Sequence, residues 1–284
     1  MNINKLILLL TFVSLNTVFA QNNVSHNSIP NSKMNNLELS KIQIIPITDT
    51  KTERHYELYI KLPEGYSENS EIDYPVLYFT DAMWHIEILS GSTEYLMENL
   101  ILVGISWQKD ERPEISRYRD YTILKSMNPK YESGDAHNHL TFIQNDIIKY
   151  VEDNYRTDTD NRTYFGYSLG GTFGAYILLT KPQTFKNYII GSPETLLDDS
   201  FLFDNNSILT QKSKDLKANV FISNGELEKK ELIAHAQGLV STVKKINDKE
   251  LLLEYVTIES ADHEKAFPMT AIKSMYWLTE ILKR

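Results

Sequence analysis

The sequence predicts an α/β fold in which a mainly parallel central sheet is flanked by helices. Three observations support this prediction. Polar and apolar residues alternate over residues 54–61, which is typical of a strand with one buried face. Residues 75–80 and 100–106 are continuous apolar runs, as expected of strands covered on both faces. From there on, apolar runs alternate with helical patterns, which is the order that produces parallel strands.

The remaining elements follow the same alternation. A helix is expected over residues 86–97, between the two apolar runs, and another over residues 142–155, where apolar residues recur at helical spacing. The further strands are expected at residues 162–167, 187–190, 219–223 and 251–258, and the further helices at residues 172–179, 232–246 and 266–282. In sheets of this kind the active site lies at the carboxyl ends of the strands.

Length, charge and cysteine content narrow the possible functions. The 284 residues are enough for one large domain, and 42% of them are hydrophobic, as in a protein with a substantial core. A net charge of −9 argues against a nucleic-acid partner, since binding phosphates requires clustered Lys and Arg. Because the chain has no cysteine, disulfides, thiolate metal sites and a cysteine nucleophile are excluded.

The N-terminus predicts export. One lysine, an apolar run over residues 6–13 and a small residue at Ala20 have the order of a signal peptide cleaved after residue 20. An uncleaved anchor is the alternative, but the apolar stretch is short for a membrane span. We therefore expect a signal peptide over residues 1–20, a flexible leader over 21–40 and the domain over 41–284. The mature protein is expected in the periplasm or outside the cell, without stable membrane insertion.

Residues 166–170, Gly-Tyr-Ser-Leu-Gly, have the G-x-S-x-G spacing of a nucleophile elbow. In this motif the chain turns sharply from a strand into a helix and holds the serine in a strained conformation, and the flanking glycines leave room for the turn. The motif lies between the strand at 162–167 and the helix at 172–179, where such a turn belongs. A tight turn without catalysis is the structural alternative. We predict that Ser168 is the nucleophile.

A serine hydroxyl needs a general base, and His263 is the best candidate. It lies in residues 260–265, an expected loop between the last strand and the last helix. This is the place of the histidine in the chain order Ser, acid, His of α/β-hydrolases. The other histidines fit less well: His55 is in a strand, His235 within a helix and His26 in the leader, while His137 and His139 form an H-x-H pair. No third ligand lies near that pair, so we interpret it as a polar helix start and predict no metal.

The third catalytic residue should orient the histidine and follow the strand at 219–223. Glu228 and Glu226 both lie there, and Asp262 is a further option that would have to fold back to reach Nδ1 of His263. We favour Glu228, then Glu226, then Asp262. The glutamates could instead form only the acidic first turn of a helix. One oxyanion-hole donor should be the N–H of Leu169, and the other should come from the loop at residues 80–84.

Residues 74–81 (YPVLYFTD), 119–122 (RDYT) and 166–171 (GYSLGG) resemble the putative-esterase family of α/β-hydrolases. That family includes esterase D, feruloyl and acetyl-xylan esterases, siderophore trilactone esterases and mycolyltransferases, and the resemblance spans most of residues 40–284. It implies an α/β-hydrolase fold, the N–H of Met83 as second oxyanion donor, and Glu228 at the acid position. The chain departs from the family in having Asp81-Ala82 where Asp-Gly is common. It also has Ser-Pro-Glu-Thr-Leu-Leu at 192–197 where a Ser-Pro-Ser-Leu-Trp-Trp type of motif is common.

Together these features predict a secreted serine esterase that works through an acyl-enzyme and needs no cofactor. The substrate is expected to be a small-molecule or carbohydrate ester, either an acylated carbohydrate or a siderophore lactone. Two alternatives remain: an acyltransferase that uses the same Ser–His site with a sugar hydroxyl acceptor, and a non-catalytic binding protein. The side chains expected to contact substrate are Trp84, His85, Trp107 and Tyr121.

Overall fold

The computed structural model describes residues 41–68, 70–126, 132–194, 217–246 and 252–283. The expected signal peptide and leader lie outside the described residues. The described residues belong to one compact unit. None of the described helices combines the length and the apolar character needed to cross a bilayer.

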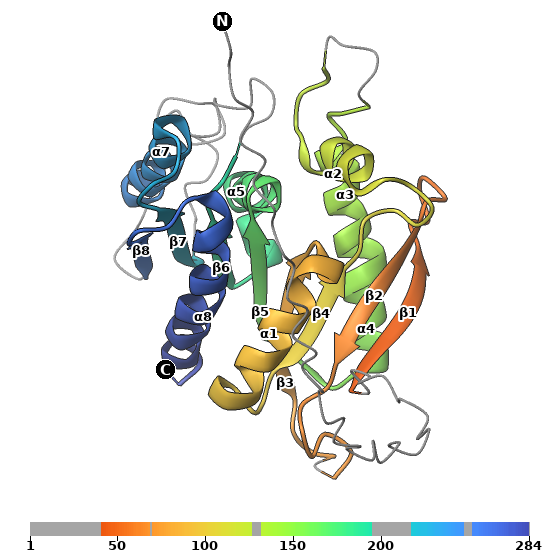
Figure 1. Ribbon diagram of the computed structural model, residues 1–284. Helices are drawn as coiled ribbons and strands as arrows, with labels where there is room; N and C mark the ends of the chain where they lie inside the picture. The colour runs from red at the N-terminus through yellow and green to blue at the C-terminus, as the bar shows by residue number, and fades with distance from the viewer. Residues whose placement is uncertain (1–40, 69, 127–131, 195–216, 247–251, 284) are drawn as a thin grey trace, which may run out of the picture. The chain divides into compact units, whose positions relative to one another are not determined.

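The central element is an eight-stranded sheet that is antiparallel at one edge and parallel elsewhere (Figure 1). β1 pairs with β2, and β2 with β4, in antiparallel register, whereas all further pairs are parallel. In sheet order the strands are β1 (Ile42–Thr48), β2 (His55–Lys61), β4 (Ile101–Ile105), β3 (Tyr74–Thr80), β5 (Thr157–Tyr167), β6 (Asn187–Gly191), β7 (Asn219–Gly225) and β8 (Leu253–Ile258). The predicted mainly parallel sheet is confirmed.

Helices cover both faces of this sheet. On one face, α1 (Ala82–Leu96) and α8 (His263–Leu282) pack side by side. The other face carries α5 (Leu169–Thr180), α7 (Lys230–Ile246) and a continuous helical run over residues 136–154. That run consists of α3 (Ala136–Phe142), a π-helical segment η1 (Ile143–Ile148) and α4 (Lys149–Asn154). α2 (Pro113–Tyr121) packs against α3 and α5, and a 3₁₀ turn η2 (Pro182–Thr184) follows α5.

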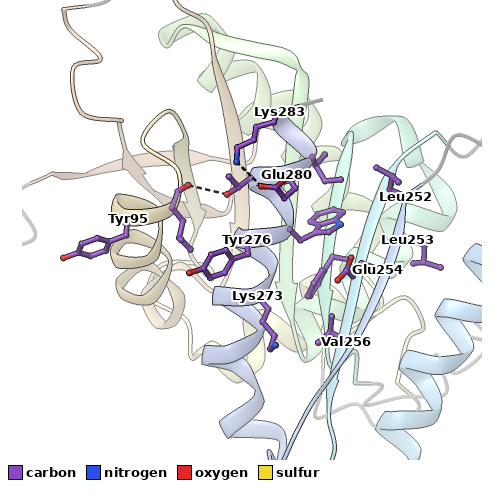
Figure 2. A pocket seen from close by; sticks show the side chains of 14 residues that line it. Tyr95, Leu252, Leu253, Glu254, Val256, Lys273, Tyr276, Glu280 and Lys283 are labelled. Carbon is purple, nitrogen blue, oxygen red and sulfur yellow. Dashed lines mark hydrogen bonds and ion pairs between the residues drawn. The ribbon is translucent and has the colours of Figure 1, made fainter.

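A hollow of about 700 Å³ lies at the β8 end of the sheet, between that strand and α8 (Figure 2). Tyr276 and Lys273 of α8 line it, together with Leu253 and Val256 of β8 and Tyr95 of α1. Figure 2 shows these side chains along β8 and the C-terminal half of α8, and none of the predicted catalytic residues is among those that line the hollow.

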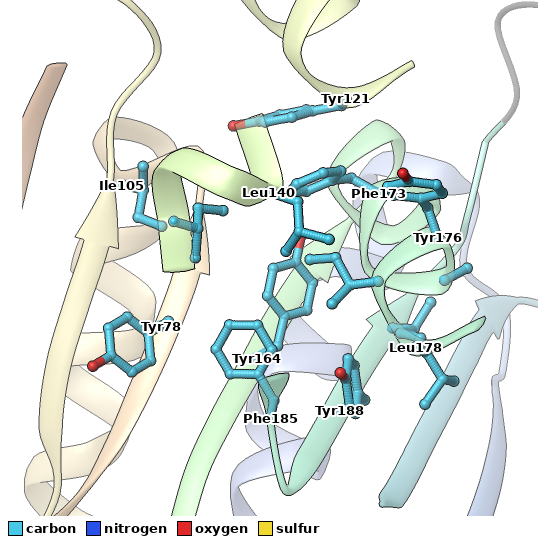
Figure 3. Close-up of a cluster of buried hydrophobic side chains, with 14 of the residues drawn as sticks. Tyr78, Ile105, Tyr121, Leu140, Tyr164, Phe173, Tyr176, Leu178, Phe185 and Tyr188 are labelled. Carbon is cyan, nitrogen blue, oxygen red and sulfur yellow. The ribbon is translucent and has the colours of Figure 1, made fainter. Parts of the chain in front are cut away.

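The apolar strands are buried on both faces because successive side chains point to opposite sides. Along β3, Val76 and Tyr78 belong to the core beneath α5, whereas Leu77 and Phe79 belong to the core beneath α1 and α8. The first of these cores is rich in aromatic rings (Figure 3). Tyr164 lies at its centre, with its ring centroid 5.4 Å from that of Phe185, and its hydroxyl donates to the carbonyl of Gly170.

Most predicted elements are present within a few residues of the expected bounds, with five differences. β5 begins at Thr157, five residues before the strand expected at 162–167. The helix expected at 142–155 begins six residues earlier, at Ala136, and contains the π-helical segment. α1 begins at Ala82 rather than at residue 86. β1 and α2 were not predicted: β1 is an edge strand that carries Pro46 and four exposed residues, and α2 is mostly polar. Neither therefore shows a clear apolar period, although Pro113 at the first helical position of α2 is a start signal.

Candidate active site

The carboxyl ends of four neighbouring strands contribute the candidate residues. Ser168 follows β5, Ser192 and Glu194 follow β6, Glu228 follows β7, and His263 follows β8. This is the edge of a parallel sheet at which ligands are bound, because the loops after the strands meet there.

Ser168 sits on the strained turn that the motif predicts. Its φ of 58° and ψ of −123° are unusual for a non-glycine residue, and it directly precedes α5. Its N–H donates to the carbonyl of Gly191 at 3.0 Å, which anchors the turn to β6. A Cβ on Gly166 would overlap the carbonyl oxygen of Gly170, so only glycine permits this approach of strand and helix. The side chain of Ser168 stays partly exposed.

His263 is the first residue of α8, not a loop residue as predicted, because Asp262 caps that helix. The Asp262 side chain accepts from the Lys265 N–H at 3.0 Å and pairs with the Lys265 ammonium, so it does not serve His263. Nδ1 of His263 lies 3.3 Å from Oε1 of Glu228. The contact is too bent for a well-aligned hydrogen bond, and we describe it as an ion-pair contact.

Glu228 is the carboxylate that the structure brings to the histidine. Its side chain is fully buried, and its Oε1 also accepts a 2.6 Å hydrogen bond from the Ser192 hydroxyl. Burial raises the pKa of Glu228, but the interactions with His263, Ser192 and the Gly225 backbone outweigh this and hold the pKa below its ordinary value. Glu226 points elsewhere, since its carboxylate accepts from the Ser260 N–H at 2.7 Å.

The pKa of His263 is raised above its ordinary value of 6.5. Burial of the ring lowers the pKa, but the Glu228 carboxylate in contact with Nδ1 opposes this, and the charges of Glu194 and Glu264 also raise the pKa. The imidazolium that forms when the ring takes up a proton is therefore stabilised by neighbouring carboxylates, which is the electrostatic role of the acid in a Ser–His–acid triad.

The two backbone groups predicted for the oxyanion hole lie in the first turns of two helices. Leu169 begins α5 and Met83 is the second residue of α1, where backbone N–H groups lack intrahelical acceptors. The two turns are in close contact, because a Cβ on Gly170 would overlap the Thr80 hydroxyl. Asp81, in the left-handed region at φ 59°, fixes the loop before Met83. Arg117 holds Asp81 through two hydrogen bonds of 2.7 and 3.1 Å.

Sequence reasoning did not assign Glu194 to the site, although the structure places it there. The Ser168 hydroxyl donates to its Oε2 at 3.0 Å, and Nε2 of His263 lies 3.9 Å from the same oxygen. The contact of Ser192 with Glu228 was missed as well. Ser192 and Glu194 lie within three residues of the end of β6. The rule that sites lie at the carboxyl ends of the strands could therefore have indicated them.

Of the four predicted substrate contacts, Trp84 is exposed, Trp107 is partly buried, and the other two are buried. Trp84 is 50% exposed and packs against Trp107, with ring centroids 5.0 Å apart, and the Arg117 guanidinium lies over the Trp84 ring. His85 is buried, stacks on Phe267 and contacts the Thr80 carbonyl, and burial lowers its pKa. Tyr121 is buried beneath Arg117 and against Phe173. The burial of His85 and Tyr121 argues against the prediction that they contact substrate, which stays untested.

The two histidines of the H-x-H pair lie in different environments, since His137 is exposed and His139 is not. His139 is buried among the rings of Tyr56, Phe142 and Phe173, so it belongs to the core. Among the described residues no group of three or more His, Asp and Glu side chains could hold a metal ion.

Comparisons with known proteins find similarity to esterases. The family model described as "Putative esterase" matches residues 50–266. The ferri-bacillibactin esterase BesA of Bacillus subtilis is 27% identical over 248 residues, which cover 78% of this chain and 84% of that protein. A siderophore enterobactin esterase of Emericella nidulans is 33% identical over 100 residues, which cover 34% of this chain and only 31% of that protein. The crystal structure of the BES protein from Bacillus cereus has the same fold, with a TM-score of 0.74 at 23% identity over 86% of this chain and 97% of that one.

Proposed function

We propose that this chain, which belongs to the putative-esterase family and is a carboxylic ester hydrolase, is a siderophore esterase that uses Ser168 as its nucleophile. The proposal rests on the geometry of the site taken together with the similarity of the chain to a siderophore esterase. A strained serine, a histidine and a buried glutamate meet at one sheet edge, in a chain similar over most of its length to a ferri-bacillibactin esterase.

In the proposed reaction, Oγ of Ser168 attacks the ester carbonyl carbon while its proton passes to Nε2 of His263. The N–H groups of Leu169 and Met83 stabilise the oxyanion that forms. The bond to the alcohol oxygen then breaks, and that oxygen takes the proton from His263 as it leaves. Water, deprotonated by the same histidine, attacks the carbonyl carbon of acyl-Ser168. The bond from that carbon to Oγ then breaks, Oγ takes the proton back from His263, and the acid is released. Glu228 orients His263 and stabilises its charged form.

Two tryptophans near Met83 support an aromatic substrate such as a catecholate lactone. Trp84 is 50% exposed and packs against the partly buried Trp107, beside the expected oxyanion donor. The Arg117 guanidinium lies 4.9 Å from the centre of the Trp84 ring, and its charge is paired with Asp81. This aromatic surface favours a substrate with flat rings that can stack on it.

The substrate class is tested by hydrolysis rates on a panel: a catecholate trilactone with and without iron, an acetylated sugar and a feruloylated sugar. We expect kcat/KM for the trilactone to exceed that for either sugar ester by at least about tenfold, equivalent to about 1.4 kcal/mol of transition-state binding. A preference for a sugar ester would overturn the siderophore assignment. Product analysis with an added polyol would detect acyl transfer.

The nucleophile is tested by Ser168→Ala, with Ser241→Ala on the exposed side of α7 as the matched control. Loss of the nucleophile should reduce kcat by roughly 10³-fold or more, since only binding and oxyanion stabilisation remain. The control should keep the wild-type rate. If Ser168→Ala stays within about tenfold of wild type, Ser168 does not perform the reaction.

A further inference from the structure

Glu194 is held firmly beside the nucleophile. Its backbone N–H donates to the Ser168 carbonyl at 3.3 Å, and its own carbonyl accepts a 2.6 Å hydrogen bond from the Thr172 hydroxyl. Both partners belong to the elbow and the first turn of α5. The backbone of Glu194 is therefore held by the same turn that holds Ser168, and its side chain lies beside the Ser168 hydroxyl.

The carboxylate of Glu194 contacts both reacting side chains. Within the described part of the chain, it accepts a hydrogen bond from the Ser168 hydroxyl at 3.0 Å, and its Oε2 lies 3.9 Å from Nε2 of His263. About 30% of the side chain is exposed, so a substrate can reach it. A carboxylate offers about four acceptor positions, and Ser168 fills one of them. The group is thus an available hydrogen-bond acceptor in the catalytic site.

The two distances place this acceptor on the alcohol side of the ester. In the proposed reaction the alcohol oxygen leaves from the carbon attached to Oγ of Ser168 and takes its proton from Nε2 of His263. It must therefore lie near both atoms, as Oε2 of Glu194 does. The oxyanion, in contrast, points to the N–H groups of Leu169 and Met83, which a carboxylate does not replace as donors.

We propose that Glu194 is a specificity-determining residue that accepts a hydrogen bond from an N–H group on the alcohol part of the substrate. Esters of N-acylated amino alcohols have such a group next to the ester, and they are the class that this site would favour. When the substrate binds, its N–H takes the place of the Ser168 hydroxyl on Oε2, and the hydroxyl turns to His263. The inference rests on the proposed role of Ser168 but not on the siderophore assignment.

The test uses two butyrate esters, of N-acetylethanolamine and of N-acetyl-N-methylethanolamine, which differ only in the N–H. We expect wild-type kcat/KM to favour the N–H ester by about tenfold, the size expected of a partly exposed hydrogen bond to a charged acceptor. Glu194→Ala should bring the ratio close to one, and Glu194→Gln should reduce it to about threefold, since an amide oxygen is a weaker acceptor. Glu194→Gln keeps the shape of the side chain, so a steric effect of the methyl group should be the same in this variant as in wild type.

Glu264→Gln is the matched control, because Glu264 also raises the pKa of His263 but is an exposed residue of α8. It should leave the ratio unchanged. A ratio near one in wild type, or an unchanged ratio in Glu194→Gln, would overturn the proposal; Glu194→Gln carries this test even if Glu194→Ala fails to fold. Full activity of Ser168→Ala would instead remove the proposed nucleophile, so the two failures are distinguishable.

Discussion

The hydroxyl of Ser192 donates a 2.6 Å hydrogen bond to Oε1 of Glu228, the oxygen that also faces Nδ1 of His263. Ser192 is itself buried and has a φ of 41°, so the turn after β6 is bent to present this hydroxyl. The acid of the candidate triad is thus held between two strand ends. The orientation of Glu228 therefore depends on Ser192 as well as on the loop that carries Glu228.

Glu228→Gln should reduce kcat by roughly 10²- to 10⁴-fold, because an amide can hold His263 in the wrong tautomer and cannot stabilise the imidazolium. Glu226→Gln is the control, since the Glu226 carboxylate bonds only to the Ser260 backbone among the contacts described. It should stay within about threefold of wild type, as expected for an exposed residue outside the reacting groups. Steady-state kinetics on one ester measures both. Equal rates for Glu228→Gln and wild type would indicate a Ser168–His263 dyad.

The pH profile of kcat/KM should rise with a midpoint above 6.5, because the general base is the neutral form of His263 and its pKa is raised. Glu264→Gln and Glu194→Gln should each move the midpoint to lower pH, since each removes a charge that favours the imidazolium. The contribution of His263 to the stability of the fold changes with pH in the opposite direction to the activity. The raised pKa of His263 stabilises the fold fully below its unfolded pKa of about 6.5, and this contribution is lost as pH rises through the folded pKa. A midpoint below 6.5 in wild type would contradict the assignment.

Gly166→Ala should destabilise the protein by about 2 kcal/mol and reduce activity, since the new methyl group overlaps the Gly170 carbonyl in the elbow. Gly91→Ala in α1 is a matched control, because nothing lies within 4 Å of a Cβ at that position. It should be neutral or stabilising by up to about 1 kcal/mol, as alanine is the better helix former. Urea unfolding gives both values, and equal stabilities would show that the elbow can relax around the methyl group.

Export is tested at the N-terminus. If residues 1–20 are a signal peptide, the mature protein recovered from the periplasm or the medium should begin at Gln21. N-terminal sequencing or intact-mass measurement distinguishes this from an uncleaved anchor, which would retain Met1 and fractionate with membranes.

The sequence predicted those parts of the site that depend on chain order. Ser168 follows from the spacing of two glycines between a strand and a helix, and His263 from its place after the last strand. Glu194 could not be assigned in the same way, because its role depends on how the chain turns after β6. The rotation of α1 likewise decided which residues after Asp81 face outward, so Trp84 and His85 are neighbours in sequence but lie in opposite environments.

Contacts between distant residues were beyond prediction from one sequence. The pairing of Arg117 with Asp81 joins residues 36 positions apart, and Arg117 lies in none of the motifs identified in the sequence. The aromatic surroundings of His139 arise from three separate elements, so the residue pattern His-x-His indicated only local polarity.

The strand order also sets how the enzyme should lose activity under mild stress. The nucleophile is on β5, near the middle of the sheet, whereas the general base is attached to β8, which has a partner on one side only. Edge strands separate from a sheet before central strands do, because an edge strand is hydrogen-bonded to one neighbour only. Partial denaturation should therefore disconnect His263 while Ser168 is still in its strained turn, leaving a folded but inactive molecule. Loss of turnover would then measure the cohesion of β7 with β8 rather than the stability of the core.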